Sequence, residues 1–191
     1  MFTHMETTSS TAAEKSRTAV LVLTGLMAAV TCILGPLSIP IGPVPISLTN
    51  LAIYLTVYIL GTRYATISYC IYLLLGLVGL PVFSSYTSGP AKLLGPTGGY
   101  LIGFIFLAMI SGAFIDRWTS KKGFCFLGMV LGTAVCYLFG TVWLAYVADL
   151  SFFAALSAGV LPFIPGDLIK IVIAMLIGPQ IRIRLLAAGL V

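Results

Sequence analysis

The chain has 191 residues, of which 60% are hydrophobic and 8% are charged, and its mean hydropathy is +1.13. Soluble globular domains carry roughly 25% charged residues. A chain of this size could not bury so much apolar side chain in one core, because much of its surface must still face water. The composition therefore excludes a soluble globular protein and predicts one compact domain within a lipid bilayer.

The net charge of +5 does not indicate nucleic-acid binding. The Lys and Arg residues are dispersed singly or in pairs at the ends of apolar runs, without a basic patch. The four cysteines lie inside apolar runs and form no CxxC pair, which is typical of small buried side chains. The single histidine, His4, lies in the polar N-terminal part. The sequence thus offers no metal site and no histidine for acid–base catalysis.

In chain order, residues 1–17 are polar and rich in Thr, Ser and Glu, and we expect a mostly disordered cytoplasmic tail there. Pro36 and Pro40 follow the first apolar run in place of a small-residue cleavage site, so we expect no cleaved signal peptide. The membrane domain, residues 18–191, contains six apolar segments near the ~17–20 residues that a helical crossing needs. They cover about 18–35, 46–61, 64–80, 98–115, 124–148 and 165–181. The chain is therefore predicted to be an all-α integral membrane protein with six transmembrane helices.

The basic residues predict the orientation of these helices. With the N-terminus inside, eight of the 10 Lys and Arg residues lie on the inner side: Lys15, Arg17, Arg63, Arg117, Lys121, Lys122, Arg182 and Arg184. The outer loops carry Lys92 alone, and Lys170 falls inside the sixth segment. The positive-inside rule therefore places both termini in the cytoplasm.

Two ionisable residues, Asp167 and Lys170, lie within a predicted membrane segment. A charged group in the hydrocarbon costs at least ~2.5 kcal/mol, so each one needs a reason. Three positions apart on a helix, they share one face, and Pro165 suits the first turn of that helix. A ligand site is the favoured reading, with an ion pair that fixes helix packing as the alternative.

Three further features of the sequence can each be interpreted in two ways, as part of a ligand site or as part of the structure. Asn50, the only asparagine, shares a helix face with Tyr54 and Tyr58, and its amide could bind a polar ligand or bond a neighbouring helix. The outer loop 80–92 could be a lid or a connector. The glycines of 95–100, including Gly98, could admit a ligand close to the backbone or allow tight helix packing.

Small-residue ridges also occur on two of the segments. Gly25 and Ala29 form one in the first segment, and Gly128 and Gly132 form one in the fifth. Such ridges let helices approach closely in lipid. We expect internal packing for the ridge of the fifth segment and an external partner helix for that of the first.

Four blocks of the sequence resemble a known family. They are Pro43-Val44-Pro45-Ile46-Ser47-Leu48, Gly79-Leu80-Pro81-Val82-Phe83, Gly95-Pro96-Thr97-Gly98-Gly99-Tyr100-Leu101-Ile102-Gly103-Phe104, and Leu161-Pro162-Phe163-Ile164-Pro165-Gly166-Asp167-Leu168-Ile169-Lys170. In this order, the blocks resemble the biotin-specific substrate-binding (S) subunit of energy-coupling-factor transporters, the BioY type. The resemblance covers nearly everything after the tail.

The resemblance implies a multi-pass subunit of a bacterial plasma membrane that captures biotin from outside under a loop lid. Its implied partners are a membrane coupling subunit, which would contact Gly25 and Ala29, and two cytoplasmic ATPase subunits. Biotin is implied as the transported ligand, without a cofactor and without an enzymatic reaction.

The resemblance also implies roles for site residues. Asp167 would accept from the ureido N–H groups of biotin, and Asn50 could complete that pattern. Lys170 would compensate Asp167 or donate to the ureido oxygen, with the ligand carboxylate as a competing partner. Phe83 and Tyr100 would form apolar walls. Lys92, or the hydroxyls of Ser84 and Ser85, would meet the carboxylate.

Other functions are less consistent with the sequence. In a self-sufficient secondary transporter of a small polar solute, coupling to protons or sodium usually needs buried carboxylates, and Asp167 is the single candidate here. Inverted repeats with paired broken helices are also missing from the sequence. An intramembrane enzyme has no acid–base pair to use. A purely structural assembly protein would leave Asp167 and Lys170 with no role beyond packing.

Overall fold

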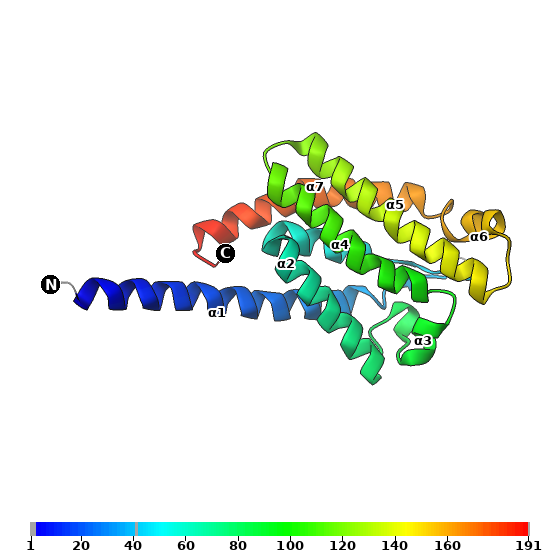
Figure 1. Ribbon diagram of the computed structural model, residues 1–191, viewed down its shortest axis with the longest axis horizontal. Coiled ribbons are helices and arrows are strands. Elements are labelled where there is room, and N and C mark those ends of the chain that lie inside the picture. Colours follow the sequence, from blue (N-terminus) through cyan, green and yellow to red (C-terminus); the bar gives the residue numbers. More distant parts are fainter. Residues whose placement is uncertain (1–2, 41, 191) are drawn as a thin grey trace.

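The computed structural model describes residues 3–40 and 42–190, with side chains from Arg17 onward. The chain is almost wholly helical (Figure 1). Its elements are α1 (Thr3–Leu34), β1 (Ser38–Ile39), β2 (Ile46–Ser47), α2 (Thr49–Val78), the 3₁₀ helix η1 (Ser84–Tyr86), α3 (Pro90–Leu94), α4 (Gly98–Trp118), α5 (Lys122–Val147), α6 (Phe152–Gly159) and α7 (Ile164–Ala187). The helical fold class predicted from the sequence is confirmed.

The helices form a bundle in which α4 and α5 pack along each other, α2 packs on α4 and α7, and α1 packs on α2. Glycines make the α4–α5 contact close. A Cβ at Gly128 would lie 2.3 Å from the Cβ of Phe114, and one at Gly132 would lie 2.7 Å from the hydroxyl of Ser111. The predicted internal packing of this ridge is confirmed, as expected of small residues between helices in lipid.

Helix α2 is broken at Gly61, whose φ of 72° and ψ of 178° favour glycine. The backbone N and the hydroxyl of Thr62 donate to Oδ2 of Asp116 in α4, at 2.9 and 2.6 Å. This carboxylate therefore satisfies a donor at the start of the second half of α2. The two halves leave the break in different directions (Figure 1). The predicted segments 46–61 and 64–80 correspond to these two halves.

The bundle exposes large apolar side chains along most of its helices, for example Val22 at 65%, Leu74 at 59% and Leu176 at 61%. Within the described residues, four helices are long and apolar enough to cross a membrane: α1, α2, α4 and α5. Helices α6 and α7, bent by 50° relative to each other, would make a fifth if they are counted as one span. The chain is therefore an integral membrane protein by length, composition and exposed surface.

Several elements differ from the sequence prediction. Helix α1 begins at Thr3 and so includes the polar segment that we expected to be mostly disordered. Ala12, Ala13 and Glu14 are strong helix formers, and they lead directly into the apolar part of the helix. The hairpin β1–β2, in which Ser38 pairs with Ser47, and the short helices α3 and α6 were not predicted.

The two ends of the bundle differ in character. The Thr3 end of α1 and the Ala187 end of α7 lie on the same side, whereas the hairpin, α3 and α6 lie at the opposite side (Figure 1). The end of the bundle with the hairpin, α3 and α6 thus contains the short elements that connect the long helices. It is also the end that contains the candidate site.

Candidate ligand-binding site

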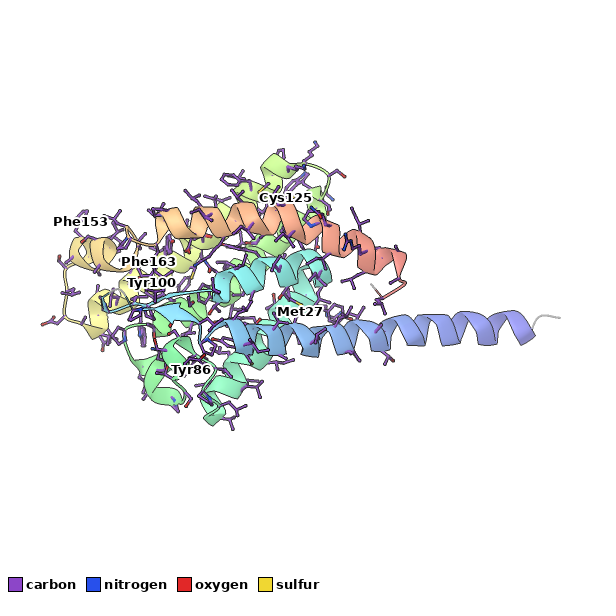
Figure 2. All side chains as sticks on the ribbon, turned by 180° about the vertical axis from the view of Figure 1, so that it is seen from behind. Met27, Tyr86, Tyr100, Cys125, Phe153 and Phe163 are labelled. Atoms are coloured by element: carbon purple, nitrogen blue, oxygen red, sulfur yellow. The ribbon has the colours of Figure 1, made fainter. Side chains whose placement is uncertain are left out.

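A cavity lies where α2, α4 and α7 begin, and it is completed by the middle of α5, the hairpin and η1. The cavity is partly open to the outside. Tyr100 and Phe163, labelled in Figure 2, both belong to its lining.

The cavity has polar and apolar lining residues. The polar ones are Ser47, Thr49, Asn50, Tyr72, Ser84, Thr97, Thr133, Tyr137, Asp167 and Lys170. The others are mainly apolar or aromatic and include Val44, Pro45, Tyr100, Leu101, Phe104, Leu107, Cys136 and Phe163. A few placed polar groups in an otherwise apolar pocket are the usual composition of a small-molecule site.

Asp167 and Lys170 form a buried ion pair at the start of α7. Nζ of Lys170 lies 2.9 Å from Oδ1 of Asp167, and each residue is 7% exposed. The same Nζ donates to the carbonyl oxygen of Ser47 at 2.7 Å, and the hydroxyl of Tyr137 donates to Oδ2 of Asp167 at 2.6 Å. Three elements thus hold the pair: α7, α5 and the hairpin. The expectation that both side chains share one helix face is confirmed.

Asn50 is buried in the first turn of α2 and lines the cavity. Its Oδ1 accepts from the backbone N of Leu51 at 3.1 Å. The two tyrosines on its face have packing roles. The hydroxyl of Tyr54 hydrogen-bonds to that of Thr133, and the ring of Tyr58 packs against Gly178.

The loop after α2 contributes Ser84 to the cavity, whereas Phe83 and Ser85 lie outside the lining. The ring of Phe83 is fully buried against Gly76, where an added Cβ would lie 2.1 Å from the ring. The backbone N of Ser85 donates to Oγ of Ser38 at 2.9 Å. Phe83 therefore anchors the loop to α2, and Ser85 ties it to the hairpin.

Lys92 and Gly98 also lie outside the lining of the cavity. Lys92 is in α3, and partial burial lowers the pKa of its ammonium group. A Cβ at Gly98 would lie 1.7 Å from the carbonyl oxygen of Leu93 and 2.9 Å from Nε1 of Trp143. That indole nitrogen donates to the carbonyl oxygen of Gly95 at 2.9 Å. The glycines at the start of α4 therefore allow α3 and α5 to approach closely.

Tyr100 does line the cavity, as an apolar wall with an anchored hydroxyl. Its hydroxyl donates to the carbonyl oxygen of Gly159 at 2.8 Å, and its ring packs on Gly140. The structure therefore brings Asn50, Ser84, Tyr100, Asp167 and Lys170 together among the predicted ligand residues.

Tyr72, Thr133 and Tyr137 line the cavity and were missed by sequence reasoning. Tyrosine and threonine are common in membrane helices, so their presence alone gives no signal. The four-residue spacing of Thr133 and Tyr137 places them on one face of α5, and that weak pattern was the available clue.

The ridge on α1 lies apart from the cavity. Gly25 and Ala29 are both exposed on the outside of the helix, and a Cβ at Gly25 would meet no atom within 4 Å. Leu26 and Ile33 extend the same exposed face. This surface is open to a partner helix.

Comparison with known proteins identifies the family. The model of the BioY family matches residues 5–187. The chain belongs to the BioY family. It is similar to the "Biotin transporter BioY" of Thermotoga maritima, with 39% identity over 85% of this chain and 95% of the relative. It is also similar to the protein of that name in Rhizobium etli, with 38% identity over 85% of this chain and 92% of the relative.

The fold of this BioY family member has a solved counterpart. A crystal structure of the S-component for biotin from an ECF-type ABC transporter superposes with a TM-score of 0.81. The two chains are 34% identical, and the match covers 87% of this chain and 92% of that one.

Proposed function

We propose that this chain captures biotin from outside the cell, as the substrate-binding subunit of an energy-coupling-factor importer in a bacterial plasma membrane. The observation that carries the proposal is the buried Asp167–Lys170 pair, which lines a cavity of polar and apolar side chains in a chain of the BioY family. The relatives named as biotin transporters and the S-component for biotin support the choice of ligand.

The geometry supports one arrangement of the ureido ring. Oδ1 and Oδ2 of Asp167 each accept one hydrogen bond within the protein, so each retains a lone pair for a ureido N–H. Lys170 donates twice to the protein and keeps a third N–H for the ureido oxygen. Asn50 would complete the polar contacts, and Tyr100 would flank the apolar part of the ligand.

The remaining predicted ligand residues would act less directly. Ser84 lines the cavity, whereas Phe83 and Ser85 in the loop after α2, Lys92 in α3 and Gly98 at the start of α4 lie outside its lining. We propose that these four residues shape the lid and the entry rather than contact the bound ligand.

We propose six crossings with both termini in the cytoplasm. The break at Gly61 supports this number, because each half of α2 then crosses separately and α6 with α7 completes the sixth span. The first half, 49–60, is ~18 Å long, shorter than the ~30 Å hydrocarbon core. The hairpin β1–β2 directly precedes this half of α2 and would cover the rest of the crossing. Irregular backbone is tolerated within a membrane where it is buried in protein.

We also propose that a membrane coupling subunit docks on Gly25 and Ala29, with two ATPase subunits on its cytoplasmic side. The exposed face of α1 supports this, since small residues let a partner helix come close. The name of the solved relative, an S-component of an ECF-type ABC transporter, supports the class of partner.

Calorimetry of the purified full chain with biotin tests the proposed function. We expect tight binding to the unchanged protein and an affinity lower by roughly 10-fold to 100-fold in Asp167→Asn, since a hydrogen bond to a charged acceptor is lost. Asp149→Asn is the matched control. Asp149 is exposed, and asparagine tolerates its positive φ of 51°. Failure of the unchanged protein to bind biotin would reject the function, and unchanged affinity in Asp167→Asn would reject the site.

A further inference from the structure

Tyr72 stands out among the tyrosines of the cavity because its hydroxyl is unpaired. The hydroxyls of Tyr100 and Tyr137 donate to the carbonyl of Gly159 and to Asp167. The hydroxyl oxygen of Tyr72 is fully buried and has no hydrogen-bond partner within the described residues 3–40 and 42–190. A buried hydroxyl without a partner is costly, and such groups are rare in folded proteins. A ligand that supplies an acceptor would remove this cost.

The surroundings of Tyr72 hold its hydroxyl in place. Its ring packs edge-to-face on Phe83, with the ring centroids 5.7 Å apart, and is 0% exposed. A Cβ at Gly35 would lie 2.6 Å from the hydroxyl oxygen, so the end of α1 closes against it. The hydroxyl of Thr49 lies nearby without the geometry of a hydrogen bond to Tyr72. Both Tyr72 and Thr49 line the cavity.

A strip of polar groups links Thr49, the neighbour of Tyr72, to the ion pair. Oγ of Ser47 donates to Oγ1 of Thr49 at 3.0 Å, and the carbonyl of the same Ser47 accepts from Lys170. The strip therefore has an acceptor at one end, the carboxylate of Asp167, and a free donor at the other, the hydroxyl of Tyr72. A matching ligand would carry a hydrogen-bond donor near Asp167 and an acceptor near Tyr72.

Biotin has this pattern, with ureido N–H groups at one end and a carboxylate at the other. We propose that the hydroxyls of Tyr72 and Thr49 donate to the carboxylate of bound biotin, and that they distinguish the free acid from derivatives with a neutral tail. This inference rests on the proposed function. In this arrangement the biotin carboxylate binds two neutral hydroxyl groups, and Lys170 binds Asp167 and the ureido oxygen.

The test compares biotin with biotinol, in which a hydroxymethyl group replaces the carboxylate, by calorimetry on the purified full chain. Tyr72→Phe keeps the ring and removes the hydroxyl. We expect it to weaken biotin binding by roughly 10-fold to 100-fold, because the acceptor is charged, and biotinol binding by about 3-fold or less. The control Tyr69→Phe removes the neighbouring hydroxyl, which donates to the carbonyl of Leu101, and should leave both affinities unchanged.

Thermal unfolding without ligand supplies a second, opposite signal. Tyr69→Phe should lower the melting temperature because it leaves a buried carbonyl unpaired, whereas Tyr72→Phe should maintain or raise it because it removes an unpaired group. Equal losses for biotin and biotinol in Tyr72→Phe, or no loss for biotin, would overturn the inference. Should Tyr72→Phe not fold, Thr49→Val decides by the same comparison. Binding of neither ligand to the unchanged protein would instead reject the proposed function.

Discussion

Asp167 has both carboxylate oxygens engaged, one by Lys170 at 2.9 Å and one by Tyr137 at 2.6 Å. Moving a charged side chain to the centre of a bilayer costs at least ~2.5 kcal/mol, and pairing offsets part of that cost. The second contact of Lys170, with the carbonyl of Ser47, fixes the pair relative to the hairpin. The site is therefore organised before any ligand arrives, which lowers the ordering cost of binding.

Removing one partner of this pair should destabilise the protein more than removing both charges. We expect Lys170→Met to lower stability by roughly 3 kcal/mol, because it leaves a buried carboxylate uncompensated. The double variant with Asp167→Asn should recover part of that loss, since no net charge remains buried. Melting temperatures in detergent measure both effects. A double variant that melts below Lys170→Met would contradict the charge argument.

Tyr137 is expected to orient Asp167 for the ligand. Tyr137→Phe removes the donor to Oδ2 and should reduce biotin affinity by about 10-fold, the effect of one hydrogen bond to a charged group. Tyr146→Phe serves as the control because Tyr146 is 82% exposed. Calorimetry on the two variants checks this, and equal affinities would remove Tyr137 from the site.

The sequence allowed part of this site to be predicted at the residue scale. Asp167 and Lys170 were found because ionisable residues are rare within membrane segments, and Asn50 was found because it is the only asparagine. Tyr72 and Tyr137 gave no such signal, because their significance depends on which atoms they meet across the bundle. Their partners, or the lack of one, are set by tertiary packing.

At the scale of elements, the break in α2 determines where the cavity walls lie. The first half of α2 carries Thr49 and Asn50, and the second half carries Tyr72. The reversal at Gly61 brings both halves to one cavity, with Asp116 satisfying the donors of Thr62. The glycine is thus a requirement of the site geometry as well as of the backbone.

Gly61→Ala should therefore destabilise the protein. A side chain at its φ of 72° and ψ of 178° costs about 1–3 kcal/mol, and the added Cβ would lie 3.0 Å from Oδ1 of Asp116. Gly123→Ala in the first turn of α5 is the matched control, because a Cβ there meets no atom within 4 Å and alanine favours helix. Thermal unfolding of both variants tests this. Equal melting temperatures would show that the break tolerates a side chain.

Long elements were predicted well and short ones were not. The apolar segments 98–115 and 124–148 correspond to α4 and α5 with shifts of a few residues at their ends. The hairpin and the helices α3 and α6 are two to eight residues long, too short for an apolar period to show. Proline and glycine marked these stretches as breaks, but their folded shape depends on contacts such as that of Trp143 with Gly95.

At the scale of the whole molecule, the cavity and the exposed ridge of α1 are separate surfaces. Ala29→Leu should block docking of the proposed coupling subunit by filling the space that a partner helix needs, while biotin binding to the isolated chain remains unchanged. Ala113→Leu on the exposed face of α4 is the control. Co-purification with the coupling subunit and calorimetry measure the two effects. Loss of biotin binding in Ala29→Leu would show that the surfaces are not independent.

Six crossings with cytoplasmic termini predict the labelling of single cysteines in a cysteine-free background. Lys92→Cys should react with an impermeant reagent added outside intact cells, and Lys121→Cys should react only after the cells are opened. These positions lie at opposite ends of α4 and its flanking elements, so one experiment tests both faces. Outside labelling of Lys121→Cys would reject the proposed orientation.

The Asp167–Lys170 pair is neutral as a unit, so a biotin carboxylate received by hydroxyl groups would enter the bilayer as an uncompensated anion. Inward passage of one negative charge against an inside-negative membrane voltage of ~100 mV costs about 2.3 kcal/mol. The voltage thus opposes the inward movement of the bound anion. Release on the cytoplasmic side is correspondingly expected to slow as the cell becomes more polarised.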